Sequence, residues 1–179
     1  MDKLALAEEK RKYFKSSTDL FRAVLLNSHD YAVWRFQKNL RKAERYKQST
    51  RLLGKILYIF YHRRKNIIGR KLGFDIPEGC FGPGLRIYHI SPIVVNPAAR
   101  IGRNCIVVGN LCIGNVKGQA IAPQIGDNCM FGWGTTVIGN ITIANNCNIA
   151  AGAVVIKSVI NDNETVGGVP ARKIGKSEK

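Results

Sequence analysis

The segment IGDNCMFGWGTTVIGNITIANNCNIAAGAVV, residues 125–155, decides the fold. A large apolar residue recurs in it at every sixth position over 30 residues. An α-helix needs a spacing of 3.6 and a half-buried strand a spacing of 2, so neither explains the pattern. A six-residue repeat is typical of a triangular solenoid, in which each hexad forms one short strand and one corner. The repeat consists of Ile125, Phe131, Val137, Ile143, Ile149 and Val155, and Ile101, Val107 and Ile113 show the same spacing upstream.

The residues between these apolar positions suit tight corners. Gly, Asn and Asp recur there, as at residues 126–128 and 139–140, and these residue types tolerate the positive φ of a sharp turn. Three hexads make one coil, so residues 18 apart should stack. Cys129 and Cys147 have this separation, and we expect them to fill the inside of a corner. We therefore predict an all-β parallel β-helix.

Residues 1–72 show a different pattern. Apolar residues lie among Lys and Arg at helix-like spacings, so we predict a basic α-helical region here. Residues 1–73 carry 19 Lys and Arg against 6 Asp and Glu, whereas residues 74–179 carry 9 against 6. Such a basic region suits an anionic membrane surface or an acidic substrate, or is simply a solvated surface. No zinc-finger, RRM-like or homeodomain signature accompanies it, so we expect no nucleic-acid partner.

Neither a membrane span nor a signal peptide is expected. The sequence has no run of 18 apolar residues, and charges interrupt any apolar stretch at the N-terminus. We therefore expect a cytoplasmic protein, with peripheral contact to an anionic membrane left open. The five cysteines form no C-x-x-C pair and show no metal-ligand spacing with the three histidines. This predicts reduced, small core residues and no metal.

The hexads stop between Gly114 and Gln124, where the sequence GNVKGQAIAPQ keeps no clear six-residue spacing. We predict a loop, 114–124, that leaves the coil. Binding residues concentrate on loops of a rigid scaffold, although a merely tolerated insertion gives the same pattern. The predicted β-helix domain covers residues 73–179 and includes this loop and a C-terminal tail.

The segment GFDIPEGCFGPGLRIYHISPIVVNPAARIG, residues 73–102, the hexads, and the ending VVIKSVINDNETVGGVPARKIG, residues 154–175, resemble the hexapeptide-repeat acyltransferases in their serine acetyltransferase-like branch. The sequence GVPAR, residues 168–172, is highly characteristic of that family. The chain looks closer still to the O-acetyltransferases of polysaccharide biosynthesis. The resemblance covers about residues 66–175. It implies a left-handed β-helix, a homotrimer with active sites between neighbouring subunits, and acetyl-CoA as the acetyl donor without a metal.

His89, within residues 87–91, is the candidate catalytic base. A hydroxyl does not attack a thioester unaided at neutral pH, and a histidine within hydrogen-bond reach can take its proton. The resemblance assigns Asp75 as the carboxylate that orients the imidazole and stabilises its charged form. The two residues are 14 positions apart, slightly less than one coil, which would let them face each other across adjacent coils. His29 and His62 match no catalytic position.

The resemblance also assigns residues to acetyl-CoA. Ala151 would let the pantetheine arm lie close to the backbone, because a larger side chain would block it. Lys157 and Arg172 match basic positions that meet the phosphates, unless they are ordinary solvated charges. Trp133 departs from the small residue of related chains, and it would shield the thioester, stack on a sugar or pack in an interface.

Two differences from the serine acetyltransferases argue against serine as the acceptor. Serine acetyltransferases carry an acidic residue where this chain has Tyr88, and Val108 and Gly109 stand where the resemblance places two further serine-binding residues. Tyr88 suits packing on a sugar face. We therefore expect an acetyl-CoA-dependent O-acetyltransferase acting on a sugar or polysaccharide precursor. A serine O-acetyltransferase of cysteine biosynthesis is the alternative, and a non-catalytic β-helix scaffold is the second.

Overall fold

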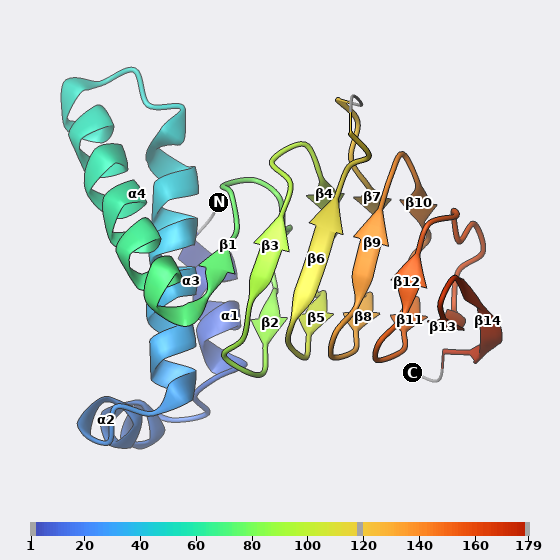
Figure 1. Ribbon diagram of the computed structural model, residues 1–179. Coiled ribbons are helices and arrows are strands. Elements are labelled where there is room, and N and C mark those ends of the chain that lie inside the picture. Colours follow the sequence, from blue (N-terminus) through green and yellow to red (C-terminus); the bar gives the residue numbers. More distant parts are fainter. Residues whose placement is uncertain (1–2, 118–119, 178–179) are drawn as a thin grey trace.

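The computed structural model describes residues 3–117 and 120–177. Residues 118 and 119, which fall in the predicted loop 114–124, lie outside the described residues, as do the two residues at each end of the chain. Within the described residues, four helices precede a solenoid of short strands (Figure 1). The helices are α1 (Lys3–Arg11), α2 (Ser17–Leu25), α3 (His29–Lys47) and α4 (Leu52–Leu72).

Local sequence signals set the helix ends. Ser16 caps α2 by accepting a hydrogen bond from the backbone N–H of Asp19. Ser28 caps α3 in the same way, with Tyr31 as the donor. Gly73 ends α4 with a φ of 78°, in the left-handed region that glycine adopts without steric cost. This turn leads the chain directly from α4 into the first strand.

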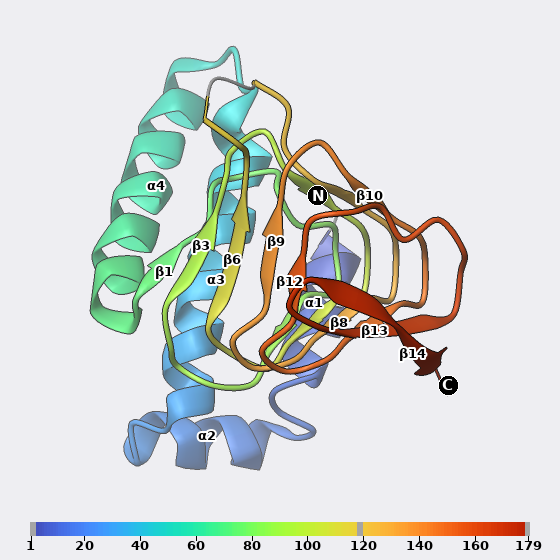
Figure 2. The same cartoon turned by 45° about the vertical axis from the view of Figure 1, so that its right-hand side comes forward.

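Three sheets form the walls of the solenoid. Neighbouring strands within a wall come from successive coils, as two views of the ribbon show (Figures 1 and 2). In the described residues the five-stranded sheet holds β1 (Phe74–Asp75), β3 (Ile93–Val95), β6 (Leu111–Gly114), β9 (Thr136–Ile138) and β12 (Val154–Val155). The three-stranded sheet holds β4 (Arg100–Ile101), β7 (Gln124–Ile125) and β10 (Thr142–Ile143). The six-stranded sheet holds β2 (Arg86–Ile87), β5 (Ile106–Val107), β8 (Met130–Phe131), β11 (Asn148–Ile149), β13 (Glu164–Gly168) and β14 (Ala171–Lys176).

The strand register confirms the predicted 18-residue coil. Met130 pairs in parallel with Asn148, 18 positions later. Across the predicted loop the step rises to 24 positions, from Cys112 to Thr136, because the loop adds six residues to its coil. The apolar hexad residues point inward, and even the most accessible member of the main repeat, Ile125, is only 6% exposed. The predicted parallel β-helix is therefore confirmed.

One corner of successive coils uses a residue in the left-handed region. Asn104, Asn128, Asn146 and Asn163 have φ values between 56° and 61°. Asparagine tolerates this conformation better than other side-chain-bearing residues do. The Asn128 side-chain amide also donates a hydrogen bond of 3.0 Å to the side chain of Asn146. The sequence preference for asparagine at these corners thus has a backbone cause and a side-chain cause.

The cysteines divide into two groups. Cys129 and Cys147 are buried inside this corner, as predicted, and Cys105 lies with them. Cys112 is exposed instead, because side chains alternate along β6 and position 112 points outward. The prediction that the cysteines are core residues is therefore wrong for Cys112.

A buried ion pair joins the helices to the first coil. Arg41 of α3 and Glu9 of α1 are 2.8 Å apart and almost fully buried. Glu9 accepts a 2.7 Å hydrogen bond from the backbone N–H of Gly84, and Arg41 donates to the carbonyls of Phe81 and Gly82 at 2.8 and 2.6 Å. Buried charges are tolerated when such hydrogen bonds satisfy them. The pair therefore fixes α1 and α3 against the start of the solenoid.

Side chains from the helical region, one from the α1–α2 connection and one from α3, also cover the free edge of β2. The Tyr13 hydroxyl accepts a 3.1 Å hydrogen bond from the backbone N–H of Ile87 and donates to Gln37 at 2.8 Å. Gln37 in turn donates to the carbonyl of Leu85 at 2.9 Å. Burial raises the pKa of the Tyr13 hydroxyl, so it stays protonated and able to donate. The outer backbone edge of the first coil is thus hydrogen-bonded by side chains, whereas each later coil is hydrogen-bonded by the strand of the coil before it.

The helices end at Leu72 and the strands begin at Phe74. The division of the chain into a 1–72 region and a 73–179 domain stays a prediction. At the other end, β14 pairs antiparallel with β13 and closes the six-stranded sheet. No helix in residues 3–117 and 120–177 has the length and apolar composition that crossing a membrane requires.

Candidate active site

His89 lies at the corner between the six-stranded and the five-stranded sheets. The strand register places one residue of each coil at the same point of this corner. The backbone N–H of His89 donates a 3.1 Å hydrogen bond to the carbonyl of Val108, which carries the register into the corner. The residues at this point of successive coils form a column. Because neighbouring strands lie about 4.8 Å apart, the column extends about 14 Å over three steps. The corner column consists of His89, Gly109, Trp133 and Ala151.

The corner of the first coil is two residues longer than the one beside it. In the first coil the inward residues on the two sides of the corner are Ile87 and Val95, eight positions apart. Their partners in the next coil, Val107 and Ile113, are six positions apart. The extra residues are Ile90 and Ser91, and the Ser91 hydroxyl anchors them by accepting a 2.6 Å hydrogen bond from the backbone N–H of Asn110. His89 therefore stands at the start of a bulged and exposed corner.

Other rings surround the imidazole of His89. Its centroid lies 6.1 Å from the Trp133 indole at 61° and 6.5 Å from the Tyr88 ring at 40°. The His29 ring stacks on it at 6.2 Å and 16°. Trp133 covers Gly109, where an added Cβ would run into the indole. The exposed imidazole is thus held between flat faces supplied by two coils and by the first turn of α3.

A charged cluster lies behind His29. The Nε2 atom of His29 lies 2.5 Å from the carbonyl oxygen of Tyr88, and because a carbonyl only accepts, Nε2 carries the proton. The same nitrogen is 3.7 Å from the carboxylate of Asp30, which pairs with Arg86 at 3.0 Å. The Arg86 guanidinium lies 3.9 Å over the ring of Tyr13. In the described residues its Nη1 atom is buried without a hydrogen-bond partner. An anion and a cation therefore stand next to His29, the ring that stacks on the candidate base.

Asp75 lies outside this cluster. It is paired with Val94 in the five-stranded sheet, and its exposed side chain lines a pocket of about 390 Å³ together with Arg70 of α4. Asp75 and His89 both belong to the described residues, and no hydrogen bond or ion pair joins their side chains. The Asp75–His89 pair therefore stays a prediction, one that requires the two side chains to approach each other.

Lys157 and Arg172 come together at the C-terminal end of the solenoid. Both line a pocket of about 460 Å³, Lys157 from the residues after β12 and Arg172 from β14. Lys173 lines the same pocket, but its charge is paired with Glu164 at 2.7 Å. Ala151 does not line this pocket. The structure thus divides the predicted acetyl-CoA residues between the corner column and a basic pocket at the end of the solenoid.

Sequence reasoning missed His29, Asp30 and Arg86. The contact between His29 and Tyr88 joins positions 59 apart, on a helix and on a coil corner. Ser28 indicates where α3 begins, but nothing in the sequence says which part of the solenoid the helix faces. Among the described residues, no group of three or more His, Cys, Asp and Glu side chains is arranged to hold a metal ion.

Residues 122–157 match the family described as bacterial transferase hexapeptide (six repeats). Together with the structural similarity reported next, this repeat confirms the predicted left-handed parallel β-helix with an N-terminal helical region. The likeness to the O-acetyltransferases of polysaccharide biosynthesis is not supported.

The chain is similar to serine acetyltransferases. It is 33% identical to the enzyme of Staphylococcus xylosus over 141 residues, which cover 68% of this chain and 64% of the relative. The soybean serine acetyltransferase apoenzyme matches with a TM-score of 0.70 and 28% identity, covering 95% of this chain and 66% of that chain. The serine acetyltransferase from Brucella abortus strain S19 matches in fold, with a TM-score of 0.73 and 23% identity over 97% of this chain and 68% of that chain. The curated relatives are longer, and this chain spans 29% to 65% of their length.

These similarities contradict the expected sugar acceptor and favour the serine alternative. The sequence argument rested on the side chains at positions 88, 108 and 109. Gly109 is buried beneath Trp133, so a side chain at this position has no room to reach an acceptor. Tyr88 supplies no anion, but Asp30 lies within reach of the same corner from α3. The argument considered only the sequence neighbours of His89 and the next coil.

Proposed function

We propose that the chain is an acetyl-CoA-dependent serine O-acetyltransferase that works as a homotrimer. The observation that carries the proposal is the exposed His89 at one end of a corner column whose other end is the small residue Ala151. The similarity to serine acetyltransferases supports the choice of reaction and of acceptor.

His89 supplies the proton transfer of the reaction. It takes the proton of the serine hydroxyl while the oxygen bonds to the carbonyl carbon of the thioester. As the carbon–sulfur bond breaks, the imidazolium returns this proton to the sulfur of CoA, so that His89 ends neutral. His29 holds the backbone carbonyl just before His89, and Trp133 packs edge-on to the imidazole. We propose these two as positioning residues and Asp75 as the carboxylate that stabilises the imidazolium.

The corner column and the basic pocket fit the two ends of acetyl-CoA. Ala151 is small and exposed at its corner, which leaves room for an extended arm beside it. Lys157 and Arg172 share one pocket, where two cations favour the phosphates of CoA. In this arrangement the thioester lies near His89 and Trp133. The charged end lies toward the last coil.

Asp30 is our candidate for the serine ammonium group. Its side chain is 32% exposed, so a ligand in water can reach it. A charged amino acid must not leave its ammonium group unpaired on binding, because the desolvation cost is large. Asp30 is held in place by Arg86, and its distance to His29 keeps it beside the reacting corner.

The homotrimer is proposed for the five-stranded sheet and the corners on its two sides. Ile90, Trp133 and Ile156 are 40%, 46% and 50% exposed along the five-stranded sheet and its corners. Apolar side chains in such a row support a neighbouring subunit that covers them and completes the groove.

The acceptor is tested by thiol release from acetyl-CoA with L-serine, L-alanine and a set of sugars. We expect serine to react with a kcat/KM above roughly 10⁴ M⁻¹s⁻¹, and alanine not to react because it has no hydroxyl. N-acetylserine, which lacks the ammonium group, should be a poor acceptor. No thiol release with serine would overturn the proposal.

The Asp30 role is tested separately. Asp30→Asn should raise the KM for serine while the KM for acetyl-CoA stays the same. Glu8→Gln is the matched control, since Glu8 is an exposed carboxylate on α1. An equal change in both KM values would place Asp30 outside the acceptor site.

A further inference from the structure

One face of α4 carries exposed apolar side chains. Their exposed fractions range from 37% to 76%. They recur at intervals of one, three, four and seven residues, so they form a single stripe along the helix. We call this stripe the α4 outer face, and it consists of Leu52, Leu53, Ile56, Ile59, Phe60 and Ile67.

The opposite face of α4 is fixed against the rest of the molecule. At Gly54 and Gly69 the helix approaches so closely that an added Cβ would collide with Ser49 and with the carbonyl of Phe74. Between them Lys65 is buried and pairs with a glutamate at 3.0 Å. The helix therefore has no freedom to turn its apolar stripe inward.

The charge around the α4 outer face has one sign. Residues 45–74 contain nine Lys and Arg and no Asp or Glu. Lys55, Arg63, Arg64 and Arg70 are exposed on the same helix. Their long aliphatic stems extend an apolar surface while the charged ends stay in water.

We propose that the α4 outer face binds the surface of an anionic lipid bilayer, with the helix lying in the interface. Exposed apolar side chains among basic ones are the pattern of interfacial helices, and the charge is complementary to anionic headgroups. A second copy of this chain fits the face less well, because two such faces would bring the exposed cations of both helices together, and α4 carries no Asp or Glu to pair with them.

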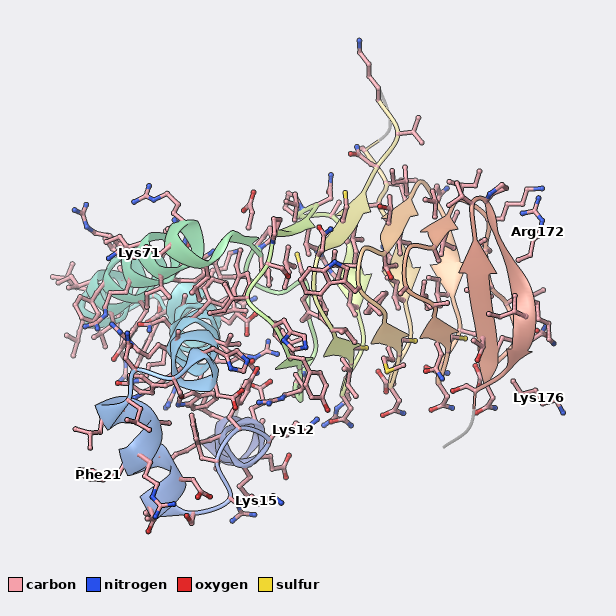
Figure 3. The ribbon with its side chains drawn as sticks, turned by 60° about the horizontal axis from the view of Figure 1, so that its bottom comes forward. Lys12, Lys15, Phe21, Lys71, Arg172 and Lys176 are labelled. Atoms are coloured by element: carbon pink, nitrogen blue, oxygen red, sulfur yellow. The ribbon has the colours of Figure 1, made fainter. Side chains whose placement is uncertain are left out.

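The proposed orientation leaves the rest of the solenoid free. α4 lies at the end of the molecule opposite β14 (Figure 1). Lys71 at the end of α4 and Arg172 in the basic pocket lie at opposite ends of the molecule (Figure 3). The β-helix would thus project away from the lipid surface, and the proposed acetyl-CoA pocket would stay accessible to water.

Flotation with vesicles tests the proposal on the whole chain. We expect binding to vesicles of phosphatidylcholine and phosphatidylglycerol at 3:1, and much weaker binding to phosphatidylcholine alone. Raising the salt concentration should weaken the binding, since screening shortens the electrostatic attraction. Lys55→Ala/Arg63→Ala/Arg64→Ala should lower the partition coefficient on the order of 100-fold, because each cation near the surface contributes about 1 kcal/mol, or roughly fivefold. Ile56→Glu/Phe60→Glu should also abolish binding.

The matched control removes three exposed cations from the solenoid, as Arg103→Ala/Lys117→Ala/Lys176→Ala. It should bind vesicles almost as the wild type does. Equal loss in the control, or no binding to anionic vesicles, would overturn the proposal. So would a change of molecular mass in Ile56→Glu/Phe60→Glu without vesicles, which would identify a second copy as the partner. Acetyl transfer measured without vesicles should not change in the α4 variants, so the lipid proposal and the proposed function can fail independently.

Discussion

The imidazole rings of His29 and His89 stack at 6.2 Å with 16° between their planes. The His29 side chain hydrogen-bonds to the carbonyl of Tyr88, and this bond fixes the backbone just before His89. The first residue of α3 thus supports a residue on a coil corner 60 positions later.

We predict that His29→Phe lowers kcat on the order of 10- to 100-fold, because a displacement of about 1 Å at the base has this effect. The phenyl ring keeps the stacking but cannot donate to Tyr88. The KM for acetyl-CoA and the thermal midpoint should change little, which separates positioning from folding. His62→Phe is the control, since His62 lies on α4. An unchanged kcat in His29→Phe would show that the contact between the two rings contributes to packing and not to catalysis.

His89→Ala should lower kcat by about 10²–10⁴-fold, the usual effect of removing a general base. Acetyl-CoA binding, measured by calorimetry, should persist because the imidazole does not hold the donor. Asp75→Asn should cost the same or less, since it affects only the support of His89. Wild-type turnover in His89→Ala would exclude His89 as the base.

Glu78 should make folding stability depend on pH. Burial alone raises its pKa, but the nearby Lys65 and His62 outweigh this and hold the pKa below the ordinary 4.5. The unfolded chain therefore binds a proton at higher pH than the folded one. The stabilisation should be complete above about pH 4.5 and should be lost as the pH falls through the folded value.

Urea unfolding at pH 7 and at pH values below 4.5 checks this for the wild type and Glu78→Gln. The variant should be less stable at pH 7, and the difference should shrink in acid. A difference that does not vary with pH would show that the carboxylate charge is irrelevant there.

Asn128→Ala should lower the unfolding free energy by about 1 kcal/mol, because alanine lacks the polar side chain that eases the left-handed region for asparagine and also loses the hydrogen bond to Asn146. Asn128 has a φ of 57°. Asn128→Gly should cost less, because glycine adopts this conformation freely, although it loses the same side-chain hydrogen bond to Asn146. Equal or reversed losses in urea unfolding would place the stabilisation in the hydrogen bond.

The solenoid could be predicted because its information is local and periodic. A six-residue spacing of apolar residues needs no knowledge of distant contacts, and the buried Phe131 and Val137 follow from it directly. The outward Cys112 could also have been found, since it lies between the inward residues 111 and 113. Composition alone had suggested a core position.

The site was less predictable because its parts come from distant segments. His29 and Asp30 reach the His89 corner through the packing of α3, which no sequence pattern specifies. The acceptor was wrongly predicted for a related reason. The argument weighed only residues next to His89 in the sequence and on the following coil, so it could not include Asp30, which lies beside His29 on α3.

The closure of the six-stranded sheet also bears on how the protein avoids fibre formation. A stack of parallel coils is a periodic template, and an open end invites a further coil from another copy. At one end β14 reverses direction, so the outermost strand no longer repeats the register of the coils. At the other end the side chains of Tyr13 and Gln37 hydrogen-bond to the backbone N–H of Ile87 and to the carbonyl of Leu85. Side chains do not offer the repeating backbone hydrogen bonds that a further strand needs. Growth of the sheet by addition of identical units is thereby blocked at both ends, and the number of coils is a property of the single chain.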